Sequence, residues 1–225
     1  YMPAYVRANL DSEKVISFAS PEQLRKYSLE GLLAEKFKQY IGKTLTELKE
    51  EFEFESKANN KSDVPNVVSR ILGIKGTKLD DIEEFMKANI QFKTIRLEPD
   101  GYPKEHMSFE QINFQAWVDN DFEDSQFYET FETTKFLLLV FEYKETAKEN
   151  PARNLYLRGI KLWNMPEETI QTYVKAMWEA GRQELINGVV FEQTPRGMKN
   201  SLPSAKDNPV CHIRPKAQNA ADTVQ

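Results

Sequence analysis

The stretch Phe136-Leu137-Leu138-Leu139-Val140-Phe141 is the most apolar block of this sequence. Six apolar residues are typical of a strand that is buried on both faces, and they are too few to span a membrane as a helix. A second strand is predicted at Ile90–Leu97, because apolar and polar residues alternate along it. Further strands are expected at Leu155–Trp163 and near Ile112–Val118. The centre of the fold is therefore predicted to be a β-sheet.

Helices are predicted before these strands. The segment Tyr27–Ile41 carries its apolar residues on one face, as an amphipathic helix does. In Thr44–Phe52, a threonine at the start is followed three residues later by a glutamate, which is the pattern of a capping box. A third helix is expected to begin at Pro65, and a fourth is expected over Leu79–Lys87.

The last part of the chain is expected to contain the longest helix and a closing pair of strands. Asn164 is expected to cap this helix, whose apolar face extends to Leu185. The strands are expected at Val189–Gln193 and Val210–Arg214. Taken together, the pattern predicts an α/β fold in which a central mixed β-sheet is flanked by helices.

The composition is that of a folded protein without a membrane span. The 225 residues are 40% hydrophobic and 12% aromatic, enough to bury a sizeable core. The sequence has no run of 18 apolar residues and no basic-then-apolar leader, so no membrane partner is expected. Cys211 is the single cysteine, which excludes an internal disulfide and favours a reducing, cytoplasmic location.

The charges are unevenly distributed along the chain. The formal net charge is −5, which by itself disfavours nucleic-acid binding, because phosphates are neutralised by local lysine and arginine. Between Phe109 and Thr134 there are seven acidic residues and no basic one. Between Arg196 and Lys216 there are five basic residues and one acidic residue. A protein with this distribution can still present a positive face, because salt screens charges beyond about 10 Å.

One candidate for catalysis lies on the strand predicted at Ile90–Leu97. Alternation places Gln91 and Lys93 side by side on one face, and Glu84 lies seven residues before Gln91. Many metal-dependent nucleases have an acid and a lysine at this spacing and a second acid upstream; the acids hold Mg²⁺ and the lysine orients the attacking water. Gln91 supplies a neutral amide where that arrangement needs a carboxylate. The same spacing is also common on solvated strand faces.

A candidate for binding follows the last predicted strand. Arg214 and Lys216 flank Pro215, which makes a stiff basic tip. Such a tip can enter a groove of DNA and place its basic groups on phosphates or on guanine O6 and N7. An ordinary turn with exposed charges has the same composition.

Other common sites are not indicated. His106 and His212 are too few and too far apart in sequence for a zinc site with Cys211, and a catalytic Cys–His pair is disfavoured. The sequence has no GxxxxGK[ST], GxGxxG or GxSxG motif. Trp117, Trp163 and Trp178 fall in predicted sheet and helix positions, where core packing is expected of them.

Several of these segments resemble the MutH family of GATC-nicking mismatch-repair endonucleases. Ile213–Ala220 is similar to that family's IRPKAxNA signature, Gly42–Leu48 to its opening helix motif, and Asn89–Thr94 stands where the family has GVELKT. The C-terminal half of the Sau-type restriction endonucleases, which contain two MutH-like domains, is still more similar: the Asp119–Ser125 acidic patch and the run Cys211–Pro215 both resemble it.

The resemblance implies a role for each candidate residue. Glu84 and Lys93 stand at the positions of the upstream acid and the lysine, whereas Gln91 replaces a glutamate and Ser69 replaces an acid on a helix. No intact catalytic set is therefore expected, and Glu84 is the only weak candidate for a metal ligand. The DNA-binding residues implied by the resemblance are Arg214, Pro215, Lys216, Lys135 and Lys199.

The resemblance also implies a domain organisation and partners. Because the chain begins at Tyr1 rather than methionine, we expect it to be part of a longer bacterial protein. Residues 1–25 are expected to lead in from an N-terminal catalytic domain, and residues 26–225 to form one MutH-like DNA-binding domain. The expected partners are duplex DNA and that catalytic domain, with self-association on DNA possible. Mg²⁺ is expected as cofactor of the parent enzyme and none for this domain.

Three functions are compatible with the sequence. In the first, the domain binds duplex 5'-GATC-3' as an effector of a type II restriction endonuclease and does not cut DNA alone. In the second, it is an active Mg²⁺-dependent nuclease in which Glu84 and Glu83 compensate for Gln91. In the third, it is a protein-interaction module that uses the acidic Phe109–Thr134 segment and does not bind DNA.

Overall fold

The described residues divide into two compact units. The computed structural model describes residues 17–54, 62–74, 79, 82–109, 111–195 and 197–214. The first unit falls within Tyr1–Ser108 and Lys135–Trp163, and the second within Phe109–Thr134 and Asn164–Gln225. We call them the sheet unit and the hairpin unit. The predicted boundary after residue 25 stays a prediction.

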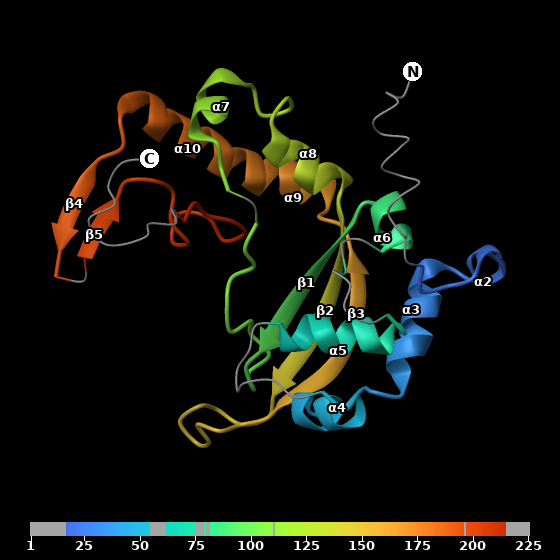
Figure 1. Ribbon diagram of the computed structural model, residues 1–225. Helices are drawn as coiled ribbons and strands as arrows, with labels where there is room; N and C mark the ends of the chain where they lie inside the picture. The colour runs from blue at the N-terminus through green and yellow to red at the C-terminus, as the bar shows by residue number, and fades with distance from the viewer. Residues whose placement is uncertain are drawn as a thin grey trace. The chain divides into compact units, whose positions relative to one another are not determined.

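The sheet unit is built on three strands in the order β1-β2-β3 (Figure 1). Strands β1 (Ile90–Leu97) and β3 (Leu155–Trp163) have the predicted bounds, and β2 (Lys135–Tyr143) extends the apolar block at both ends. β1 runs parallel to β2, and β3 runs antiparallel to it, so the sheet is mixed as predicted. Side chains 136 to 139 of the central strand are all buried, so this stretch is buried on both faces as predicted.

In the described part of the sheet unit, five helices precede or lie beside the strands. They are α2 (Pro21–Lys26), α3 (Leu29–Lys38), α4 (Leu45–Glu51), α5 (Asp63–Ile71) and α6 (Glu83–Lys87). Thr44 caps α4 and forms the predicted capping box with Glu47. The expected helix over Leu79–Lys87 is shorter than predicted, and α5 begins two residues before Pro65.

One face of the sheet packs against these helices. The core of the unit joins side chains of α3, α4, α5 and α6 to alternate side chains of the strands, among them Ile90, Leu137, Leu139, Phe141 and Leu157. Phe92, Ile160 and Leu162 pack at its margin. The side chains that alternate with these along β1 and β3 therefore project from the opposite face of the sheet.

The hairpin unit contains helices where one strand was expected. The segment near Ile112–Val118 forms α7 (Phe114–Asp119), so the predicted strand there was wrong. The Asn113 side chain accepts a hydrogen bond from the Ala116 amide and starts the helix. The acidic segment continues into α8 (Gln126–Thr133), which Ser125 caps in the same way.

The longest helical segment is interrupted by a π-helix. It consists of α9 (Glu167–Thr169), the π-helix η2 (Ile170–Val174) and α10 (Lys175–Asn187). The predicted cap at Asn164 was wrong: the helix begins after Pro166, whose extended backbone sets the start, and the Asn164 amide instead donates to the Thr134 carbonyl over 3.4 Å.

The chain then forms a hairpin and an irregular segment. Strands β4 (Phe191–Thr194) and β5 (Gly197–Asn200) are antiparallel partners, close to the predicted Val189–Gln193 strand. The second predicted closing strand, Val210–Arg214, was wrong, since this segment has no regular secondary structure. Among the described residues, no helix has both the length and the apolar character needed to cross a bilayer.

Candidate functional site

The Glu84 carboxyl group accepts hydrogen bonds that the sequence analysis did not predict. It lies on α6 with 7% of its surface exposed. Its Oε1 atom accepts hydrogen bonds from the Ala19 amide over 3.2 Å and from the Ser17 hydroxyl. Its Oε2 atom is buried and has no hydrogen-bond partner among the described residues. The carboxyl group therefore faces the Ser17–Ala19 segment and is used to hold it.

Apolar packing fixes the same segment. Phe18 and Ala19 are both buried, and the Phe18 ring lies 5.8 Å from the Phe85 ring, centroid to centroid. The Lys36 ammonium lies over the Phe18 ring, 5.8 Å from its centroid. Glu84 and Phe85 thus bind adjacent residues of one segment, the first through its carboxyl group and the second through its ring.

Ser69 and Gln91 supply no charge to replace the expected acids. Ser69, on α5, is 1% exposed and its hydroxyl donates to the Asn66 carbonyl over 2.9 Å within the same helix. Gln91, on β1, is half-buried and aligned with Phe136 of β2.

Lys93 projects from the sheet face opposite the helix-packed core. Its Nζ atom donates to the Ser108 carbonyl over 2.9 Å, at the end of the sheet unit's first segment. Glu84 and Lys93 therefore have different partners. Within the described ranges, no group of three or more His, Cys, Asp or Glu side chains is placed to hold a metal ion.

The Mg²⁺ ion that the resemblance implies for the parent enzyme does not fit these residues. Mg²⁺ prefers charged carboxylates and water in octahedral geometry. Two of the expected acids are a serine and a glutamine, and the remaining acid has one oxygen in hydrogen bonds to Ser17 and Ala19. The arrangement can anchor a polypeptide segment, and it lacks the charge to activate a water through a metal.

A second lysine on the Lys93 face was missed by sequence reasoning. Lys93 is aligned with Leu138 of β2, which is aligned with Lys161 of β3. Both lysines therefore lie in one row on one face, about 10 Å apart by the usual strand spacing. Lys161 is exposed. The alternation in β3 could have placed Lys161 on a face, but the register with β1 is set by the sheet.

The predicted DNA-binding residues are divided between the units. Lys135 begins β2 in the sheet unit, whereas Lys199 on β5 and Arg214 belong to the hairpin unit. Lys199 and Arg214 are exposed, and Lys135 is half-buried. Pro215 and Lys216 lie outside the described residues.

Cys211 is close to Arg214 in sequence and is half-buried. Burial raises the pKa of its thiol to about 11, so the thiol is protonated at neutral pH. A protonated thiol is a poor nucleophile.

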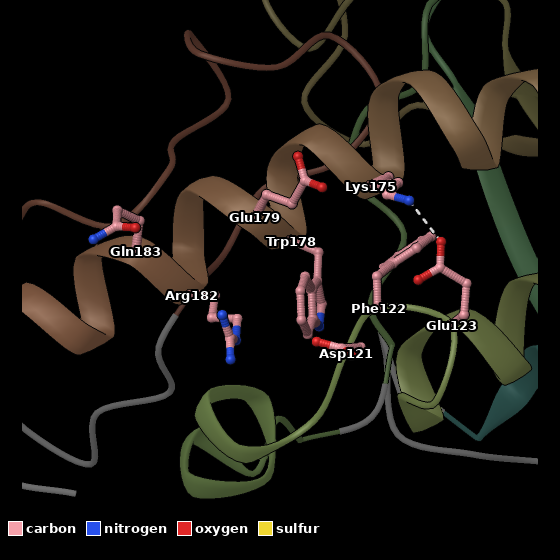
Figure 2. Close-up of a pocket in the computed structure, with 8 residues that line it drawn as sticks. All are labelled: Asp121, Phe122, Glu123, Lys175, Trp178, Glu179, Arg182 and Gln183. Carbon is pink, nitrogen blue, oxygen red and sulfur yellow. Dashed lines mark hydrogen bonds and ion pairs between the residues drawn. The ribbon is translucent and has the colours of Figure 1, made fainter.

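A cavity of about 340 Å³ lies in the hairpin unit against α10 (Figure 2). Both of its basic side chains, Lys175 and Arg182, are already engaged, the first with a carboxylate and the second with the backbone. The Lys175 ammonium hydrogen-bonds the Glu123 carboxylate over 2.6 Å, which lowers the pKa of Glu123 and raises that of Lys175. The Arg182 guanidinium donates to the carbonyls of Trp117 and Val118. These contacts fasten α7 and the following loop to α10.

Comparison with known proteins agrees with the predicted fold. The family model described as DNA mismatch repair enzyme MutH matches residues 76–175. The chain is also 31% identical over 233 residues to the type II restriction enzyme Sau3AI of Staphylococcus aureus, an alignment that covers 97% of this chain and 47% of that protein. The chain is thus similar to the MutH family over residues 76–175 and to a type II restriction enzyme over most of its length.

The two matches include different candidate residues. The MutH-like match at residues 76–175 includes all three strands of the sheet unit together with Glu84, Gln91 and Lys93. It ends before Arg214, which only the longer alignment with Sau3AI can include. The chain spans about half the length of that relative.

The anchoring role of Glu84 in this MutH-like chain predicts a local effect of its removal. In Glu84→Ala, the Ala19 amide loses a charged acceptor, and we expect its hydrogen exchange to accelerate roughly 10-fold or more. The matched control is Glu83→Ala, because Glu83 pairs with the exposed Lys87 side chain on the same helix. Equal protection of the Ala19 amide in both variants would show that the carboxyl group does not hold the segment.

Proposed function

We propose that this domain binds duplex DNA containing 5'-GATC-3' and assists cleavage by a catalytic domain of the same polypeptide, without cutting DNA alone. The observation that carries the proposal is the contrast between the two candidate sites. The acids needed for metal binding are replaced or engaged elsewhere, whereas Arg214 is exposed.

The loss of cutting chemistry has a physical basis in the sheet unit. A metal-dependent nuclease needs two or more carboxylates that converge on one ion beside the scissile phosphate. Here one carboxylate remains, and Ser17 and Ala19 donate to it. Lys93 retains its charge, but without a metal-bound water beside it this charge supports phosphate binding rather than hydrolysis.

DNA binding is supported by exposed cations in both units. Lys199 and Arg214 are available to contact DNA from the hairpin unit, and Lys161 from the sheet unit. In a protein with a net charge of −5, such local cations provide the phosphate contacts that the overall charge does not. The similarity to a type II restriction enzyme also supports DNA as the partner.

The proposal extends to the complete protein. A cleaving domain elsewhere in the same polypeptide would hold Mg²⁺, while this domain would bind a second copy of the site. If each polypeptide binds two copies of the site, the second binding event is intramolecular, and the protein holds the two copies together.

The proposal is tested by titrating a labelled duplex with the domain at several salt concentrations in the presence of Mg²⁺. We expect log K to fall linearly with log salt, with a slope that counts the phosphates neutralised, and no cleavage product at high protein concentration. A salt-independent signal, or cleavage of the duplex by the domain alone, would contradict the proposal.

A further inference from the structure

The segment that leads to Arg214 is irregular and yet firmly attached to the hairpin unit. Ile213 is 5% exposed, and its backbone amide donates to the Pro203 carbonyl over 3.0 Å. Between them, the Asp207 carboxylate accepts from both the amide and the hydroxyl of Ser204 and closes a turn. These bonds bring the two ends of the segment together and fix where its last residues leave the unit.

A glycine of α10 makes room for Ile213. A Cβ atom at Gly181 would lie 2.5 Å from the Ile213 Cδ1 atom and 2.8 Å from the Trp117 Cζ3 atom, both closer than packed carbons approach. Glycine is a poor helix former, so its presence inside a helix indicates a packing requirement. Gly181 and Trp117 therefore form a seat on the helix surface, and the Ile213 side chain occupies it.

A second attachment uses the π-helix. The Asn208 side chain is largely buried, and its Nδ2 atom donates to the Tyr173 carbonyl of η2 over 2.7 Å. Its Oδ1 atom accepts from the amides of Val210 (2.9 Å) and Cys211 (3.1 Å). A π-turn changes the hydrogen bonding of the helix locally, and such turns are frequent at functional sites. Here the π-helix supplies a carbonyl to which Asn208 ties the segment.

We propose that Gly181 and Asn208 are positioning residues for sequence reading by Arg214. They fix Ile213 and the Val210–Cys211 backbone to the η2–α10 helix, so that Arg214 leaves the unit at a defined place. This inference rests on the proposed function. Hydrogen bonds to base edges require placement within about 0.5 Å, whereas attraction to phosphates tolerates displacement. Loss of the seat should therefore reduce discrimination between sequences more than it reduces affinity for DNA in general.

The test is the ratio of affinities for GATC and scrambled duplexes, measured with Gly181→Ala in the full chain. We expect this ratio to fall roughly 10-fold, a loss comparable to one misplaced base contact, while affinity for the scrambled duplex and its salt slope stay within about two-fold of the wild-type values. Gln183→Ala, an exposed change on the same helix, is the control and should leave the ratio unchanged.

A rescue and a second variant separate positioning from general damage. Ile213→Val removes the Cδ1 atom that the new methyl group of Gly181→Ala would meet, so the double variant should regain part of the ratio. Asn208→Ala should lower the ratio of affinities without changing the contact between Gly181, Trp117 and Ile213. If Gly181→Ala does not fold, Asn208→Ala alone tests the positioning role.

The possible results have distinct meanings. If folded Gly181→Ala and Asn208→Ala both keep the wild-type ratio, or lose affinity for both duplexes equally, the positioning role is overturned. If the wild-type domain does not bind either duplex, it is the proposed function that has failed.

Discussion

Arg214→Ala is expected to weaken binding of a GATC duplex by about 1–3 kcal/mol, roughly 5- to 150-fold. Arg214 is exposed and follows Ile213, whose side chain is seated on α10, so its guanidinium group is presented from a fixed point. Because arginine contacts both base edges and phosphates, affinity for a scrambled duplex should fall less than affinity for GATC.

The control for this substitution is Arg25→Ala, which removes the same charge from the exposed surface of α2. Equal losses for the two arginine variants would mean that net charge, and not a contact made by Arg214, determines affinity. Lys216→Ala, at a position outside the described residues, is expected from the sequence to relax the preference for GATC.

Gln91→Glu is expected to leave the domain unable to cut DNA. The substitution restores one carboxylate on β1, but Ser69 remains uncharged and Glu84 remains bonded to Ser17 and Ala19. Mg²⁺ would therefore meet a single newly available carboxylate, too little to hold it beside a phosphate. The measurement is cleavage of GATC-containing plasmid in Mg²⁺ by Gln91→Glu at high protein concentration.

The exposed Gln171→Glu change on η2 controls for the added negative charge, which by itself weakens attraction to DNA. Gain of site-specific cutting by Gln91→Glu alone would show that the loss of activity lies in one ligand. The engagement of Glu84 would then be irrelevant to catalysis.

Strands with a clear two-residue alternation could be predicted from the sequence. The bounds of β1 and β3 agree with prediction because apolar and polar side chains alternate or cluster there without interruption. The same criterion failed near Ile112–Val118, where Ile112, Phe114, Ala116 and Val118 also alternate with other residues. Asn113 caps a helix instead, and the buried contact of that helix is made by Trp117.

Features that depend on distant segments could not be predicted. Val210–Arg214 has the composition of a strand, but its backbone bonds to Asn208 and Pro203 rather than to a partner strand. The π-helix has no sequence signal that we recognise.

The candidate sites likewise contain some features that could be predicted from the sequence and others that could not. The absence of a carboxylate at Gln91 was visible from the sequence, since it depends on residue type alone. The engagement of Glu84 was not, because its partners Ser17 and Ala19 lie more than 60 residues earlier in the chain. Gly181 lies inside a predicted helix, but its contact with Ile213 is visible only in the fold.

The proposed function is that this domain reads a DNA sequence without cutting the DNA. It is tested by a side-by-side titration of labelled GATC and scrambled duplexes of equal length with the wild-type domain. Tighter binding to GATC at every salt concentration, with both duplexes intact at the end, is the expected result. Equal affinity for the two duplexes at every salt concentration would contradict it.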